Sequence, residues 1–111
     1  MLGNINQISS LDCLPPNLIE LSCYDNQITQ LDNLPLRLKR LNCNFNRITS
    51  LDYLPTALKS LDCYGNYIKS LSNLPRTLKD LNCNGNYLDK VDNLPPAILN
   101  YKITHCINDD L

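Results

Sequence analysis

The feature of this sequence that most constrains its fold is a pattern of leucine, cysteine and asparagine that returns every 20 residues. The pattern reads L-x-x-L-x-C-x-x-N-x-I/L, and its copies start without insertion or deletion at Leu18, Leu38, Leu58 and Leu78. A fixed period of about this length is typical of a solenoid, in which each repeat forms one coil and packs only against its neighbours. The sequence therefore predicts stacked coils in which every twentieth residue is structurally equivalent.

The spacing inside one copy predicts a short strand and a buried asparagine. Leu41 and Cys43 are two residues apart, which places both on one face of a strand over roughly Arg40–Asn44. The amide that follows recurs at Asn6, Asn26, Asn46, Asn66 and Asn86. An amide both donates and accepts hydrogen bonds, so stacked Asn side chains can satisfy backbone groups of the turn. Left unpaired, each such buried group would cost about 1–3 kcal/mol.

The second half of each repeat, Leu-Asp-x-Leu-Pro-x-x-Leu, has apolar residues at spacings of 3, 4 and 3, which alone would favour a helix. A proline stands in the middle of this segment: Pro15, Pro35, Pro55, Pro75 and Pro95. It removes a helical hydrogen bond and pushes the preceding Leu towards extended geometry. We therefore expect an extended or polyproline-like segment with at most one 3₁₀ turn.

The cysteines are placed as core residues rather than as a disulfide framework. Four of the six occupy the inward slot of the repeat: Cys23, Cys43, Cys63 and Cys83. Neighbouring strands lie about 4.8 Å apart, but parallel in-register side chains rarely reach the disulfide dihedral. Zinc would need converging His or acidic partners that the slot lacks. We expect a ladder of reduced, buried thiols, with no metal or cofactor, and Cys13 and Cys106 as the more reactive thiols.

These residues resemble the leucine-rich repeat family, whose signature L-x-x-L-x-L-x-x-N/C-x-L the chain matches with Cys in the third apolar slot. The 20-residue period is similar to that of bacterial effectors with an extended Leu-Pro back face, and of short repeats in giant-virus proteins. The resemblance implies an α/β-type leucine-rich repeat solenoid, right-handed, with parallel strands on the concave face. Its convex face would carry extended, polyproline or 3₁₀ segments, with little or no α-helix. The helical cap and ubiquitin-ligase domain of some effectors are not seen in this sequence.

The repeat divides the chain into one domain spanning residues 1–111. We expect a half repeat at 1–10, full repeats at about 11–30, 31–50, 51–70 and 71–90, and a divergent terminal repeat at 91–111. Gly3 replaces the slot cysteine, so the first strand is expected to be weak. No polar segment covers the N-terminal end in the sequence, so this end is predicted to be uncapped and able to self-associate end to end through residues 1–10. A final strand is expected near Asn100–Thr104, followed by an irregular ending.

Composition and charge exclude several classes of function. The net charge of −1 gives no basic surface for nucleic acid. The sequence contains neither an apolar run that could span a bilayer nor a secretory signal, which favours the cytoplasm and excludes a membrane partner.

Charged columns recur along the repeats as well. The acidic column consists of Asp12, Asp32, Asp52 and Asp92, and the basic column of Lys39, Lys59 and Lys79. We expect each Asp to cap local backbone rather than to bind a cation, and each Lys to lie on a solvated edge. The single histidine, His105, is expected to be a surface residue, because no Ser or Cys constellation suggests catalysis.

The outward residues of stacked strands form a grid that is the candidate partner-binding site. Its members are Ser22, Tyr24, Asn42, Asn44, Phe45, Asp62, Tyr64, Asn82 and Asn84. Tyrosine favours recognition because it combines a large contact area with a polar tip, and the family resemblance implies protein binding on this concave face. The alternative is that these residues merely suit a strand.

No nucleophile–base pair, phosphate-binding loop or metal-ligand spacing points to an enzyme. The main hypothesis is therefore a non-enzymatic protein–protein interaction module with an unknown protein partner. Two alternatives stay open. One is a structural repeat protein that assembles end to end, and the other is the substrate-recognition part of a ligase assembled in trans.

Overall fold

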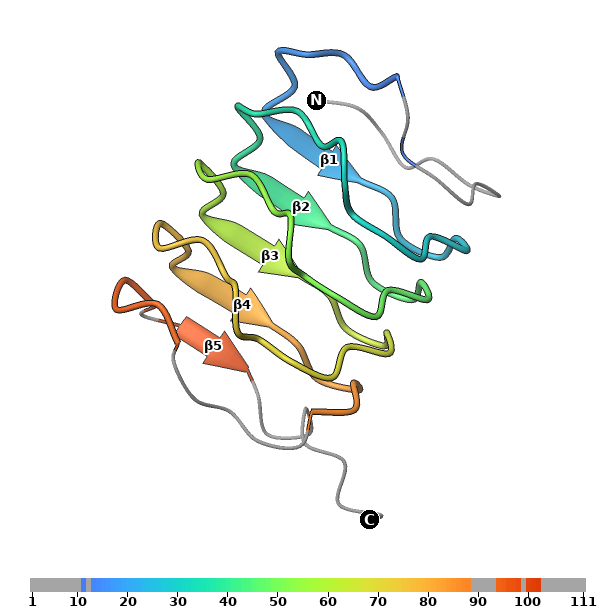
Figure 1. The fold of residues 1–111 in the computed structure, drawn as a ribbon, viewed down its shortest axis with the longest axis vertical. Helices are drawn as coiled ribbons and strands as arrows, with labels where there is room; N and C mark the ends of the chain where they lie inside the picture. Colours follow the sequence, from blue (N-terminus) through green and yellow to red (C-terminus); the bar gives the residue numbers. More distant parts are fainter. Residues whose placement is uncertain (1–10, 12, 89–93, 99, 103–111) are drawn as a thin grey trace.

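The computed structural model describes residues 11, 13–88, 94–98 and 100–102 of the chain. Its strands are β1 (Glu20–Ser22), β2 (Arg40–Asn42), β3 (Ser60–Asp62), β4 (Asp80–Asn82) and β5 (Asn100–Lys102). They form one parallel sheet in chain order, stacked along the length of the molecule (Figure 1). Each residue pairs with its equivalent 20 positions later, as Leu41 does with Leu61. The predicted equivalence of every twentieth residue is confirmed for these strands.

Each strand is three residues long, which is shorter than the predicted span of Arg40–Asn44. The hydrogen bonding between repeats nevertheless continues beyond it, since the amide of Cys43 donates to the carbonyl of Asp62 at 2.8 Å. Beyond the strand the chain turns at Phe45, which adopts a left-handed backbone with φ of 57°. The last strand begins at Asn100 as expected, and its predicted extension to Thr104 lies outside the described residues.

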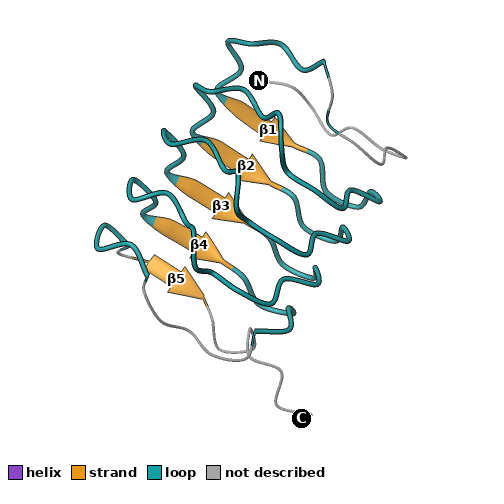
Figure 2. Cartoon of the chain, viewed as in Figure 1, coloured by secondary structure: helices purple, strands orange, loops and turns teal. Residues whose placement is uncertain are grey.

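The prediction that the proline segments are not helical is confirmed. No helix occurs in the part of the chain that the structure describes, and loops and turns make up each coil between its strands (Figure 2). In place of a 3₁₀ helix, each proline carbonyl accepts one hydrogen bond three residues on, as from the amide of Leu38 to Pro35 at 3.2 Å. Pro35 itself is buried. The residues described therefore contain no helix of the length and apolarity needed to cross a membrane.

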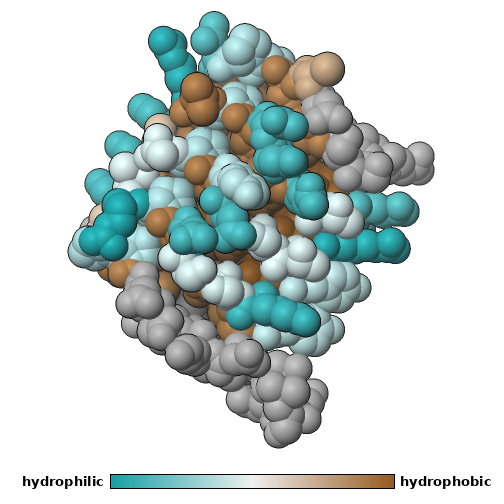
Figure 3. Space-filling model, viewed as in Figure 1, coloured by the Kyte–Doolittle hydropathy of each residue, from teal (hydrophilic) through white to brown (hydrophobic). Residues whose placement is uncertain are grey.

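The core is a continuous stack of the same side chains from each repeat. In repeat 31–50 the buried apolar residues are Leu31, Leu34, Leu38, Leu41, Cys43 and Ile48, none more than 7% exposed. Their equivalents in neighbouring repeats join them in one hydrophobic cluster. In Figure 3, hydrophobic residues are visible between hydrophilic side chains that project around the molecule. One repeat alone cannot cover these residues, so each coil depends on the next.

The core thiols Cys23, Cys43 and Cys63 are buried and form no disulfide. These three each donate a weak hydrogen bond to the following repeat, for example from Cys43 Sγ to the carbonyl of Asp62 at 3.5 Å. Burial raises the pKa of the Cys23 thiol to about 12. Burial also raises the pKa of Cys43 and Cys63 well above the ordinary value, with smaller contributions from neighbouring thiols and Asp62. These thiols are therefore poor nucleophiles. Cys13 is exposed, and Cys106 lies outside the described residues.

The asparagine ladder forms as the sequence predicts. Asn66 is 1% exposed, and its Nδ2 donates to the carbonyl of Cys63 at 3.1 Å and to that of Cys43, one repeat back, at 3.0 Å. Its Oδ1 accepts from the amide of Ile48 at 3.0 Å. Asn46 and Asn86 repeat the same three bonds. One side chain per repeat thus joins two coils, leaving these backbone groups satisfied.

Candidate functional site

The predicted site residues lie at the ends of the strands and just beyond them. We define the strand face as the outward-facing residues of β1–β4 and of the three positions that follow each strand. Ser22, Asn42, Asp62 and Asn82 are half-buried at the strand ends, while Tyr24 and Tyr64 are 42% and 40% exposed. The in-register pairing stacks each of these columns along the sheet. The structure therefore brings the predicted residues together on one surface.

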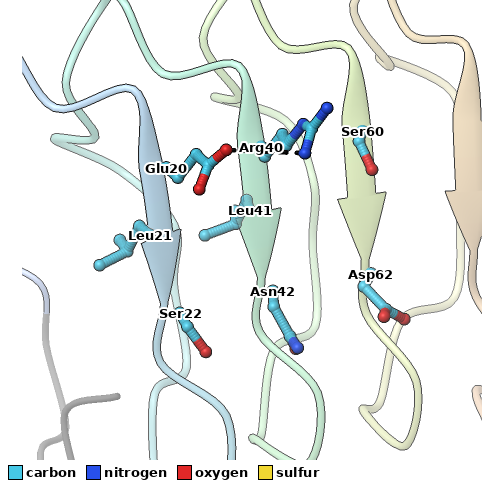
Figure 4. Close-up of a pocket in the computed structure, with 8 residues that line it drawn as sticks. All are labelled: Glu20, Leu21, Ser22, Arg40, Leu41, Asn42, Ser60 and Asp62. Carbon is cyan, nitrogen blue, oxygen red and sulfur yellow. Dashed lines mark ion pairs between the residues drawn. The ribbon is translucent and has the colours of Figure 1, made fainter. Parts of the chain in front are cut away.

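A shallow hollow of about 210 Å³ lies on the strand face over β1, β2 and β3. Figure 4 shows the residues that line it: Glu20, Leu21, Ser22, Arg40, Leu41, Asn42, Ser60 and Asp62. Near the starts of the strands, Arg40 pairs with Glu20 at 3.6 Å. Asp62 stands at the opposite end of β3 in the same view. The sequence prediction included Ser22, Asn42 and Asp62 but missed Glu20 and Arg40, although both precede an inward Leu and so face outward.

Asp62 differs from its equivalents in how its side chain is bonded. Asn42 Oδ1 accepts from the amide of Asn44 at 3.1 Å, and Asn82 Oδ1 accepts from the amide of Asn84 at 3.3 Å. The corresponding amide beyond Asp62, that of Tyr64, donates instead to Asn44 Oδ1 at 2.7 Å. Asp62 Oδ1 is buried and accepts no hydrogen bond within the described residues.

Phe45 and Tyr64 form an aromatic pair that joins two neighbouring repeats. In the sequence they follow Asn42 and Asp62, which line the hollow. The rings of Phe45 and Tyr64 meet edge to face, with centroids 5.2 Å apart and planes at 70°. A Cβ on Gly65 would lie 2.8 Å from Phe45 Cδ1, so the glycine leaves room for that ring. Phe45 is 54% exposed and has a φ of 57°, a conformation that is rare for a bulky residue. An exposed aromatic residue in a strained backbone is a candidate for function.

A second aromatic pair was not predicted. Tyr67 and Tyr87 stack with centroids 5.7 Å apart and an interplanar angle of 26°, and both are exposed. They occupy the slot between the buried Asn and the buried Ile or Leu. The signal that could have found them is the recurrence of Tyr one period apart, since equivalent residues stack on neighbouring coils.

The charged columns follow the predictions only in part. Lys39, Lys59 and Lys79 are exposed, as expected of a solvated edge. Asp52 Oδ1 accepts from Asn73 Nδ2 of the next repeat at 2.9 Å rather than capping its own backbone. Hydrogen bonds from Ser50 and Asn73 lower the pKa of Asp52.

The remaining acidic positions and the histidine are placed as follows. Asp32 is exposed, whereas Asp12, Asp92 and His105 lie outside the described residues.

The surface away from the strands also carries exposed apolar side chains. Leu36 and Tyr53 are 81% and 76% exposed. Each lines a separate shallow hollow, of about 360 Å³ and about 240 Å³ respectively. Because these hydrophobic residues are isolated from one another in different repeats, they do not form a column like those on the strand face.

Among the described residues, no group of three or more His, Cys, Asp or Glu side chains could hold a metal ion. The exposed polar atoms of the strand face are carboxylates, amides, hydroxyls and one guanidinium, which can bind by hydrogen bonds and charge. This surface is therefore equipped for recognition.

Comparisons with known proteins agree with this structure. A family model described as Leucine Rich repeats (2 copies) matches residues 36–76. Among solved structures, the chain is similar to YopM from Yersinia enterocolitica WA-314, with 32% sequence identity and a TM-score of 0.74. That similarity covers 93% of this chain and 25% of the YopM chain, so this chain spans about a quarter of the length of YopM. The comparison with curated proteins finds no match.

These matches, the 20-residue period, the in-register parallel strands and the buried asparagine ladder lead to the same conclusion. The chain belongs to the leucine-rich repeat proteins and has their solenoid fold, built from short repeats with little helix.

Proposed function

We propose that this leucine-rich repeat chain is a non-enzymatic interaction module that binds a protein partner through its strand face. The leucine-rich repeat fold and its similarity to YopM support the general role of a protein-interaction repeat. The main support for this choice of face is the exposed aromatic pair of Phe45 and Tyr64, in which Tyr64 follows the hollow-lining Asp62 by two residues. Aromatic side chains are enriched among the residues that dominate binding energy.

The shape of the strand face supports a protein partner rather than a small molecule. The hollow of about 210 Å³ is smaller than the roughly 300–1,000 Å³ of small-molecule pockets. In-register columns instead offer a broad surface with polar and aromatic groups in alternation, as at Tyr24, Asn44, Tyr64 and Asn84. Such a mixture is typical of interfaces in which a few aromatic anchors are surrounded by hydrogen-bonding groups.

The test is a partner screen followed by matched substitutions on the two sides of the molecule. Once a partner has been identified, Tyr64→Ala and Phe45→Ala should each weaken binding by roughly tenfold or more, the usual size for an aromatic hot spot. Tyr53→Ala is the control, because Tyr53 is even more exposed but lies away from the strand face. Equal losses at Tyr53 and Tyr64, or no loss at either strand-face residue, would contradict the proposed face.

Four further predictions follow from the sequence. End-to-end association through residues 1–10 concerns a segment outside the described residues. Action as the recognition part of a ligase assembled in trans is an alternative function, and so is a purely structural role. A cytoplasmic location is also proposed, and a core of free thiols supports it because such thiols persist in reducing compartments.

A further inference from the structure

Asp62 is the one acidic residue in its column of the described strands. The equivalent residues in β1, β2 and β4 are the neutral Ser22, Asn42 and Asn82, and Lys102 occupies this position in β5. Of the buried side-chain oxygen and nitrogen atoms that the structure describes, Asp62 Oδ1 is the one without a hydrogen-bond partner. Such an atom costs the free energy of its lost hydration. The fold itself would be more stable with an asparagine here, because an amide carries no charge to desolvate.

The neighbouring residues explain why the fold does not satisfy this carboxylate. Its natural donor is the amide of Tyr64, two residues on, by analogy with Asn42 and Asn44. Asn44 Oδ1 already accepts from that amide at 2.7 Å. A tyrosine at position 64 and an asparagine one repeat earlier thus remove the donor that would otherwise serve Asp62.

No cation on the strand face neutralises Asp62 within the described residues. Arg40, the basic residue lining the hollow, forms its ion pair with Glu20 at 3.6 Å. Figure 4 shows that pair near the starts of the strands, whereas Asp62 lies at the end of β3. The hollow therefore has a compensated end and an end with an unpaired negative charge.

We propose that the protein partner inserts an arginine or lysine side chain into this hollow, with its cationic head against Asp62. The inference rests on the proposed function and states the chemistry of the partner at the same face. A guanidinium or ammonium group carries donors only, so it supplies what the carboxylate lacks. Asp62 is half-buried, so its other oxygen, Oδ2, can accept from the incoming donor while the positive charge compensates the carboxylate as a whole.

The aromatic pair of Phe45 and Tyr64 suits the same occupant, because Tyr64 lies only two residues beyond Asp62. Phe45 and Tyr64 each expose a large part of their rings. A cation is attracted to the face of an aromatic ring, and the aliphatic stem of Lys or Arg packs well on apolar surface. A basic side chain whose head reaches Asp62 would therefore find both charge and hydrophobic contact within one strand face.

The experiment selects binders from a random library of short displayed peptides on the immobilised full chain and on two variants. Asp62→Asn removes the unpaired charge and reproduces the residue of the neighbouring repeats. Asp80→Asn is the matched control, because it removes one exposed carboxylate from the adjacent strand, β4. Wild type and the Asp80 variant should enrich peptides containing Arg or Lys. Replacing Asp62 should reduce their binding at least about tenfold, since loss of one partner of a desolvated charge pair weakens binding strongly.

Each outcome has a defined meaning. Enriched peptides without a basic residue, or equal binding by wild type and the Asp62 variant, would overturn this inference and leave the proposed face intact. If no peptide is enriched on any of the chains, both the face and the inference fail. Thermal unfolding checks the fold: Asp62→Asn should keep or raise Tm by a few degrees, as expected when a desolvated charge is removed. Asp62→Ser, which matches the equivalent Ser22, provides a second neutral variant.

Discussion

Asn66 and Asp62 are two polar side chains of one repeat, four residues apart, and the fold treats them in opposite ways. Asn66 is buried and makes bonds with backbone groups of two coils. Asp62 lies at the end of β3 with one oxygen buried and unpartnered. The asparagine recurs in every described repeat, whereas the aspartate occurs once in its column.

This difference separates structural residues from candidate recognition residues within a single chain. A residue that closes the hydrogen bonds between coils is needed in each repeat, because each interface between coils is alike. A residue with a buried polar atom that lacks a hydrogen-bond partner destabilises the fold locally, and such residues are expected at functional sites. Residues at the same position of different repeats can therefore be compared within one chain. Asp62 differs from Asn42 and Asn82 in its charge and in its hydrogen bonding.

The largest effect should come from breaking the ladder. Asn66→Ala would leave the amide of Ile48 without its acceptor, while the carbonyls of Cys43 and Cys63 lose one donor each and keep those of Asn46 and Asn86. At about 1–3 kcal/mol for the orphaned amide and about 1 kcal/mol for each lost bond, the free energy of unfolding should fall by about 3–5 kcal/mol. Urea unfolding measures this change. The matched control is Asn73→Ala, an exposed amide bonded to Asp52, which should change stability by no more than about 0.5 kcal/mol. Comparable losses for the two variants would contradict the structural role of the ladder.

Alkaline pH tests the buried thiols that alternate with the ladder. In the unfolded chain a Cys loses its proton near pH 9, while the folded Cys23 keeps it up to about pH 12. Above pH 9 the unfolded state therefore binds fewer protons, and stability falls as pH rises. Each strongly buried thiol should cost about 1.4 kcal/mol by pH 10. Urea midpoints at pH 8 and pH 10 measure the loss.

The control for the thiol prediction is Cys13→Ser, which removes an exposed thiol and should still lose stability at pH 10, because the buried thiols remain. A thiol-labelling reagent should modify Cys13 in the folded chain and reach Cys43 and Cys63 only on unfolding. Equally fast labelling of all three would show that the thiols do not belong to the buried core.

A smaller effect is expected where the aromatic pair crosses between repeats. Gly65→Ala should destabilise the chain by about 1–2 kcal/mol, because position 65 has a φ of 73° and the new Cβ would lie 2.8 Å from Phe45 Cδ1. Phe45→Gly removes the ring and places glycine in a left-handed position, as in the next two repeats. In that background Gly65→Ala should retain only the backbone cost. Additive effects in this double-mutant cycle would contradict the contact.

The smallest effect is expected at the ion pair between Arg40 and Glu20, which lines the hollow near the starts of the strands. The side chains of Arg40 and Glu20 are 73% and 37% exposed. Exposed pairs contribute little, so Glu20→Gln should change the unfolding free energy by less than about 0.5 kcal/mol. Thermal unfolding at low and high salt measures this. A change above roughly 1 kcal/mol, the upper end for exposed pairs, would show that this end of the strand face has a structural role after all.

Much of the fold was predictable because the repeat supplies several concordant signals. The period-2 spacing of Leu41 and Cys43 predicts the strand, Pro35 excludes the helix, and Asn46 predicts the ladder. The strand length was overestimated, because hydrophobic spacing does not show that regular strand geometry ends at Asn42. The left-handed turn at Phe45 is not visible from that spacing either. Gly65 and Gly85 in the same slot are the sequence signal for that turn, since glycine adopts positive φ without penalty.

The sequence predicted which residues of the candidate site face outward, but it did not predict their hydrogen bonds or ring contacts. Alternation placed Ser22, Asn42 and Asp62 outward on the strand face, and the structure agrees. It did not indicate that Asn44 takes the donor of Asp62 or that the ring of Phe45 lies over Gly65. Both facts concern contacts between residues about 20 positions apart, which no local pattern specifies.

The sequence by itself determined the period, the inward and outward columns and the absence of helix in the proline segments. These follow from periodicity and from the fixed backbone of proline, which act over a few residues. Only the tertiary structure decided which polar groups are satisfied across neighbouring coils and which one is not. Hydrogen-bond partners compete for the same donor in three dimensions, and the outcome depends on distances of a few tenths of an ångström.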